Sequence, residues 1–140
     1  MRVSASAILS AAAAAVVIAA IIGGLSLIGS PAHERMRRLD EQRIADLRGI
    51  ASAVDRYWTR HGSLPSSLDV LAKERDVSIK LMDPESKQEY GYRADGTKGF
   101  TLCANFAQSS PDDQDMHRDN FWSHGPGPHC FELVPRDIKR

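Results

Sequence analysis

The chain has 140 residues, with 18 Lys and Arg against 18 Asp and Glu, so its formal net charge is zero. There is no basic excess of the kind that binds nucleic acid, and no acidic run that is typical of a disordered tail. After the apolar N-terminal run, about 110 residues remain for one soluble domain, which can fold but has little stability to spare.

The apolar run comes first. From Ala5 to Gly29 there is no charged residue, and about 20 such residues are enough to cross a bilayer as a helix. We therefore predict a transmembrane anchor over residues 1–30 that contacts lipid through residues 5–29. A cleaved secretory signal is the alternative, because residues 30–32 resemble a small-residue cleavage site, although signal h-regions are typically about 7 to 15 residues long.

A helix is predicted to start at the next residues. Ser30 suits an N-cap, Pro31 suits the first helical position, and Glu34 lies in the first turn, where the helix dipole favours a carboxylate. Residues 31–45 are polar on nearly every side, which favours a solvated helical stalk. An apolar stripe at helical spacing strengthens from Ile44 onward and should pack on a sheet.

Turn residues then divide the rest of the chain. Gly62 and Pro65 end the long helix, and Ser66 is predicted to cap a short helix ending near Glu74. Alternating apolar residues predict strands over residues 88–94, 98–106 and 129–134. The fold class is therefore α+β, a long amphipathic helix packed on a small antiparallel sheet over residues 46–135, followed by a tail over 136–140. The predicted core comprises Leu47, Val54, Tyr57, Trp58, Leu64, Phe100 and Leu102.

Several of these residues together resemble a known family. They are Arg48, Ile50, Ala53, Val54, Tyr57, His61-Gly62, Leu64-Pro65, Ser67-Leu68, Asp83-Pro84, Tyr90, Tyr92 and the run 99–104. In order and spacing, over about residues 44–106, they resemble the helix end, turns and first strands of type IV pilins and the major pseudopilins of type II secretion. This resemblance implies a pilin-like fold, a location on the secreted side of the membrane and, often, a disulfide.

The sequence departs from that family at its N-terminus. The prepilin peptidase signature is a Gly followed by Phe-Thr-Leu-Ile-Glu before the apolar run. Here the nearest string is residues 24–29, which lies at the other end of the run and has Gly29 in place of the glutamate. We therefore predict a single-pass envelope protein that acts through protein contacts or as a structural component, with another envelope protein or a second copy of itself as the partner. The alternative is a true pilin or pseudopilin subunit.

The two cysteines bear on the orientation of the domain. Cys103 and Cys130 fall at equivalent depth in two predicted strands, which favours a disulfide, with two free core thiols as the alternative. A disulfide requires an oxidising compartment, and we predict an inner-membrane protein whose domain is periplasmic. The arginines at 35, 37, 38 and 43, which follow the apolar run, would by themselves favour the cytoplasm.

The loop from Gln108 to Pro128 holds the remaining candidates for chemistry. The resemblance implies calcium in this region, with Asp112, Asp113, Asp115 and Asp119 as candidate ligands, although their spacing is not that of an EF-hand. A solvated loop is the simpler interpretation, and no cofactor is predicted. A zinc site built from His117, His124 and His129 is a weaker alternative.

Two further features of the sequence concern catalysis and binding. No nucleophile elbow is present, and Cys103 with a histidine is the one pair that could support nucleophilic chemistry, so we predict a protein that is not an enzyme. Phe121 and Trp122 are adjacent aromatic residues that either anchor the loop to the domain or contact a partner.

Overall fold

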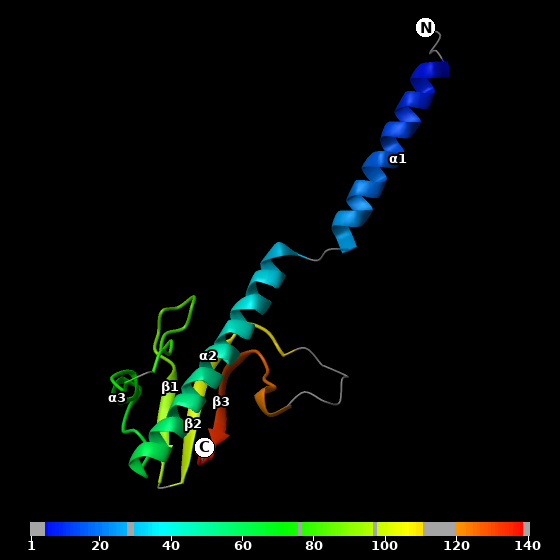
Figure 1. The fold of residues 1–140 in the computed structure, drawn as a ribbon. Helices are drawn as coiled ribbons and strands as arrows, with labels where there is room; N and C mark the ends of the chain where they lie inside the picture. The colour runs from blue at the N-terminus through cyan, green and yellow to red at the C-terminus, as the bar shows by residue number, and fades with distance from the viewer. Residues whose placement is uncertain (1–4, 28–29, 76, 97, 111–119, 139–140) are drawn as a thin grey trace. The chain divides into compact units, whose positions relative to one another are not determined.

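A computed structural model describes residues 5–27, 30–75, 77–96, 98–110 and 120–138. The order of elements is α1 (Ala5–Leu27), α2 (Pro31–His61), α3 (Leu68–Ala72), β1 (Gly91–Asp95), β2 (Gly99–Phe106), η1 (Asn120–Trp122) and β3 (Gly127–Leu133). The chain divides into two compact units, residues 1–35 and 36–140. Figure 1 shows the elements of each unit.

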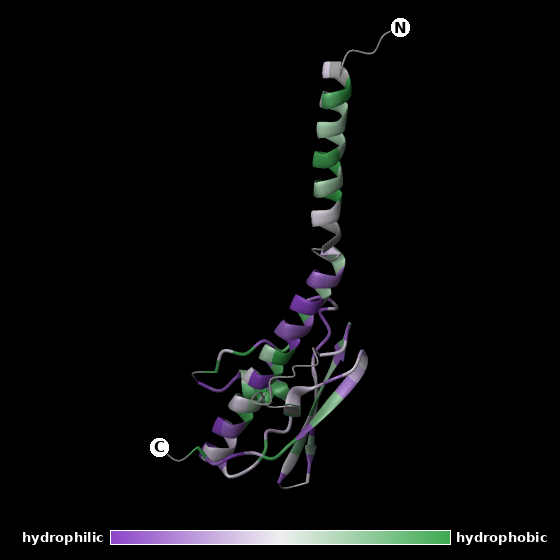
Figure 2. Ribbon diagram, turned by 90° about the vertical axis from the view of Figure 1, so that its right-hand side faces the viewer, coloured by the Kyte–Doolittle hydropathy of each residue, from purple (hydrophilic) through white to green (hydrophobic). Residues whose placement is uncertain are grey.

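The first unit contains α1, whose described side chains, Ser6 and residues 8–24, are exposed. Figure 2 colours this helix mostly hydrophobic and the first turns of α2 hydrophilic. In the described part of the chain, no helix has the length and apolar character that crossing a membrane requires. The predicted membrane segment, residues 5–29, extends beyond these side chains at both ends.

The second unit is an α+β domain, as predicted. Strands β1, β2 and β3 form an antiparallel sheet in that order, and α2 runs along one face of it (Figure 1). Phe100, Leu102 and Phe106 of β2 and Phe131 of β3 are buried, because alternate residues of a strand share a face. The other buried members of the core are Leu47, Ile50, Ala51, Ala53, Val54, Leu68, Leu71 and Tyr90.

Three predicted core residues are only half-buried. Tyr57 and Leu64 pack against the core from its edge. Trp58 is of intermediate exposure and is not among the core residues, so its predicted place in the core is wrong. Trp58 lies on the apolar stripe, but in the last turn of α2. There the other described elements shield the helix only partly from solvent.

The packing of α2 begins earlier than residue 46. The second unit starts at Met36, and Asp40 and Arg43, which were predicted to lie on a solvated stalk, are buried. The predicted tail is also attached to this helix. The backbone N–H of Arg136 donates to Asp55 Oδ1 at 2.9 Å, and that of Ile138 donates to Thr59 Oγ1 at 3.1 Å.

Local chemistry sets most of the element boundaries. Ser67, and not Ser66, is the N-cap of α3, because the helix begins one residue later than predicted and Ser67 Oγ accepts from Val70 N–H at 3.4 Å. The first strand begins at Gly91 and not at residue 88. Its predicted start instead pairs with the preceding segment, since Tyr90 N–H donates to the Leu81 carbonyl at 2.9 Å.

Gly62 ends α2 as predicted. Its φ is +67°, and its N–H donates to the Trp58 carbonyl at 2.8 Å, the hydrogen bond of a left-handed helix cap. A Cβ at this position would meet no atom within 4 Å, so the cost of any side chain is conformational and not steric.

We expect Gly62→Val to lower the free energy of unfolding by about 1 to 2 kcal/mol, because a β-branched residue resists the left-handed region. Gly62→Asn should cost less, since asparagine visits that region more readily. Urea denaturation followed by circular dichroism measures both. Equal losses would show that the backbone conformation at Gly62 does not limit stability.

Candidate functional site

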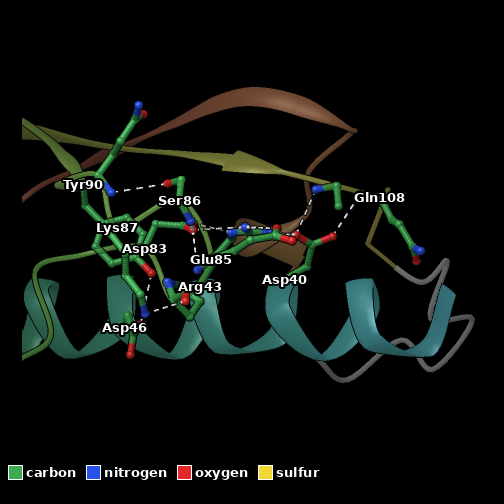
Figure 3. Close-up of polar contacts among 12 residues, drawn as sticks. Asp40, Arg43, Asp46, Asp83, Glu85, Ser86, Lys87, Tyr90 and Gln108 are labelled. Atoms are coloured by element: carbon green, nitrogen blue, oxygen red, sulfur yellow. Dashed lines mark hydrogen bonds and ion pairs between the residues drawn. The ribbon is translucent and has the colours of Figure 1, made fainter. Parts of the chain in front are cut away.

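The most concentrated polar chemistry in the described domain is a buried cluster around one arginine. The Arg43 cluster consists of Asp40 and Arg43 from α2, together with Asp83 and Glu85 from the segment before β1 (Figure 3). Asp40, Arg43 and Asp83 are all buried. Burying a charge is unfavourable unless opposite charges and hydrogen bonds compensate it, so the pairing must be complete.

Arg43 uses all three nitrogens of its guanidinium. Nε donates to Asp83 Oδ2, Nη1 donates to Asp40 Oδ1 at 2.8 Å, and Nη2 donates to Asp83 Oδ1 at 3.2 Å and to Glu85 Oε2 at 3.1 Å. The hydrogen bond to Asp83 above all raises the pKa of Arg43, against the effect of burial. The guanidinium is therefore permanently charged.

The two buried carboxylates also bind backbone. Asp83 Oδ1 accepts from the N–H groups of Glu85 at 2.9 Å and Ser86 at 2.8 Å, which shapes the Asp-Pro turn. Burial acts to raise the pKa of Asp83, but the hydrogen bonds from Arg43 and these two N–H groups outweigh it and hold the pKa well below its usual range. Asp83 is thus an anion that its partners hold in place.

Asp40 connects α2 to the end of β2. Its Oδ1 accepts from Ala107 N–H at 2.9 Å and its Oδ2 accepts from Gln108 N–H at 2.8 Å. The Arg43 cluster therefore joins three segments that are distant in sequence, near residues 40, 83 and 107. No buried side-chain nitrogen or oxygen of the described residues lacks a partner. Because its donors and acceptors are already engaged, the cluster is suited to hold the fold and not to transfer protons.

The hydroxyl groups of two tyrosines form further hydrogen bonds that hold the domain together. Tyr90 Oη donates to Asp46 Oδ2 at 3.0 Å, and Tyr92 Oη donates to the Pro65 carbonyl at 2.8 Å. Burial raises the pKa of Tyr92 to about 12, and the pKa of Tyr90 is raised as well, again chiefly by burial. Both phenols therefore stay neutral and act as hydrogen-bond donors.

On the opposite face of the sheet lies the predicted disulfide, which is confirmed. Cys103 and Cys130 are directly paired on β2 and β3, with Cα atoms 4.1 Å apart. Gly91 pairs with Cys103 from the other side, and a Cβ on Gly91 would lie 2.9 Å from the Cys103 Cβ. The disulfide prevents that half-cystine from moving aside, so only glycine fits beside it.

Gly91→Ala should therefore destabilise the oxidised domain by about 1 to 3 kcal/mol, the usual cost of overpacking. Gly49→Ala is the matched control, because Gly49 lies inside α2 with no atom within 4 Å of an added Cβ. Alanine there should be neutral or stabilise by up to about 1 kcal/mol. Urea denaturation of both variants tests this, and a Gly91→Ala variant as stable as wild type would contradict the close contact.

An aromatic cluster lies at the β3 side of the sheet. Its members are Phe106, Phe121, Trp122, His124, His129 and Phe131. Trp122 is half-buried, 4.8 Å from the Phe131 ring, with Arg48 Cζ 5.7 Å from its centroid. Phe121 is 50% exposed. The predicted aromatic pair thus divides, with Trp122 attached to the core and Phe121 left accessible.

Of the remaining predicted metal ligands, the structure describes only His124 and His129. The calcium candidates Asp112, Asp113, Asp115 and Asp119, and also His117, lie outside the described residues. His124 stacks on Phe106 and His129 lies against Phe131. No group of three or more potential metal ligands occurs among the described side chains.

The fold defines the class of this protein, an α+β domain with a long helix packed on a three-stranded antiparallel sheet. Comparison with protein-family models, with curated proteins and with solved structures gave no significant match.

Proposed function

We propose that this chain is a pilin-like protein of the bacterial envelope, held in the inner membrane by residues 5–29, with its domain in the periplasm. In this proposal it acts through contacts with other proteins and not through catalysis. The observation that carries the proposal is the disulfide Cys103–Cys130, because disulfides persist in oxidising compartments and are rare in the cytosol.

The case for an anchor comes from the sequence. Residues 5–29 carry no charge and form a run long enough for a bilayer, followed by a polar helix that starts at Pro31. A domain exported behind such a segment would meet the oxidising conditions that its disulfide needs.

The resemblance to pilins is supported by the structural roles of the residues that carry it. Gly62 caps α2, Pro65 is buried and accepts from Tyr92, Asp83 binds Arg43, and Tyr90 binds Asp46. Motif residues that hold one fold together are stronger support than motif residues scattered over a surface. They favour the pilin-like fold but do not by themselves specify a process.

A role in protein contact is supported by the exposure of one aromatic side chain next to the core. The charged groups of the Arg43 cluster are paired with one another inside the domain. Phe121, in contrast, presents an aromatic side chain to solvent beside the half-buried Trp122 and the buried Phe131. Aromatic residues supported in this way often dominate binding energy at protein interfaces.

Alkaline phosphatase fused after residue 140 tests the location, because this enzyme is active only when exported. We expect activity in the membrane fraction that resists alkaline carbonate extraction. The variant with Val17→Asp and Ile21→Asp should lose that activity, since each acid in the centre of a span costs about 2.5 to 3.5 kcal/mol. The matched variant with Val17→Leu and Ile21→Leu should retain it. A cytoplasmic, soluble fusion would overturn the proposal.

The contact role requires a separate measurement. A photoreactive phenylalanine analogue at Phe121 should form a defined adduct in intact cells, whereas the same analogue at the exposed Lys73 should form none of that mass. Identical patterns from both positions would argue against a contact surface at Phe121.

A further inference from the structure

A buried histidine lies at the joint between the end of β2 and the segment that leads into β3. His124 is 8% exposed, and its imidazole stacks on Phe106 with ring centroids 3.7 Å apart and planes inclined by 18°. Phe106 is itself buried in the core. The imidazole therefore forms part of the apolar packing at this end of the domain.

Two hydrogen bonds attach the backbone of His124 to Ser110. The N–H of Ser110 donates to the His124 carbonyl at 2.9 Å, and the N–H of His124 donates to Ser110 Oγ at 3.2 Å. We call these two residues the Ser110–His124 joint. Gln108, two residues before Ser110, is held by Asp40 of α2. The joint thus links α2, the end of β2 and the start of β3.

The charged and titratable groups around the imidazole come from two packed elements. Asp40 of α2, which is paired with Arg43, favours the protonated ring, and His129 of β3 disfavours it. Nδ1 lies 3.3 Å from the Gly125 carbonyl, and this contact and one with the Gln108 backbone also favour protonation. Burial is the largest influence, and it lowers the pKa of His124 below its usual range.

We propose that the Ser110–His124 joint is an acid-sensitive device, in which uptake of one proton by His124 expels its ring from the stack on Phe106 and opens the joint. Phe106 and Phe131, each 3% exposed when the joint is closed, would then reach solvent. The device needs no ligand, and it does not depend on the proposed location of the protein.

The direction of the response follows from linkage. Above a pH of about 6.5 His124 is neutral in both the closed and the open state, so the closed joint is fully stable. As the pH falls from there toward the lower pKa of the closed state, the open state takes up the proton first. The opening constant then rises by at most about tenfold per pH unit, the limit for one proton.

Hydrogen exchange of the full chain in detergent, read by mass spectrometry at a pH of about 7.5 and about 5.5, tests the proposal. After correction for the intrinsic pH dependence of exchange, protection of peptides covering residues 100–110 and 121–131 should fall at the lower pH. We expect a factor of at least about three and at most about ten, because the open state gains its proton only below a pH of about 6.5, one unit above the lower pH. Peptides from residues 47–58 of α2 should not change.

Two variants make the result specific. His124→Phe retains an aromatic ring on Phe106 but cannot bind the proton, so its protection should not change with pH. His129→Gln removes a neighbouring histidine and should keep the response. A wild-type protein without the response, or a His124→Phe variant that shows it in full, would overturn the proposal. If His124→Phe does not fold, NMR titration of His124 in the wild-type protein replaces it as the test. A pKa of His124 at or above about 6.5 in the folded protein would overturn the proposal.

Discussion

Arg43→Met is expected to lower the free energy of unfolding by about 3 to 5 kcal/mol, because it leaves the buried carboxylates of Asp40 and Asp83 without their common cation. Methionine fills a similar volume, so the loss reports the charge and not a cavity. For a domain stabilised by about 5 to 15 kcal/mol, this is a large fraction of the total. Urea denaturation monitored by the fluorescence of Trp58 and Trp122 measures it.

Arg60→Met is the matched control on the same helix. Arg60 is 47% exposed and lies 3.5 Å from Glu74, and exposed ion pairs of this kind contribute at most about 1 kcal/mol. Arg43→Lys should fall between the two, since lysine restores one charge but not the planar set of donors. If Arg43→Met and Arg60→Met lost the same stability, the Arg43 cluster would not be a main support of the fold.

The same cluster makes stability depend on acid. The lowered pKa of Asp83 means that its stabilising contribution is fully present above the pKa of the unfolded chain, about 4. That contribution is lost as the pH falls below this value toward the lower pKa of the folded state. This range lies below the one in which His124 titrates, so the two effects can be separated in one pH series.

Phe100→Ala is expected to cost about 3 to 5 kcal/mol, because Phe100 is 1% exposed and its removal leaves a cavity between α2 and the sheet. Trp58→Ala should cost clearly less, although tryptophan is larger, since Trp58 is only half-buried and stands outside the core. Thermal unfolding followed by circular dichroism compares the two variants. A greater loss from Trp58→Ala would place the centre of the core at the end of α2.

Trp58 illustrates what hydrophobic spacing can predict. The spacing of Leu47, Ile50 and Val54 identified the buried face of α2, because that face depends only on helix geometry. The spacing could not show how far along α2 this face is buried, because that depends on where the elements packed against the helix begin and end. The strands, the cap at Gly62 and the disulfide were likewise predicted from local patterns.

The Arg43 cluster was missed for a related reason. Asp40 and Arg43 lie three residues apart on the helical stretch that was predicted to be solvated, and they form an ion pair at 2.8 Å. Its burial depends on Asp83 and on the backbone of residues 107 and 108, far away in the sequence. The Asp83-Pro84 turn was visible in the sequence, but nothing local connected it to Arg43.

We propose that the domain closed by the Cys103–Cys130 disulfide is anchored and exported. Intact-mass measurement on protein extracted from its native membranes distinguishes this proposal from its alternatives. Alkylation under denaturing conditions should add nothing before reduction and two groups after it. The mass should correspond to a chain that retains residues 5–29. Two alkylated cysteines before reduction would contradict the oxidised domain, loss of about thirty residues would indicate a cleaved signal, and a processed, methylated N-terminus would indicate a pilin subunit.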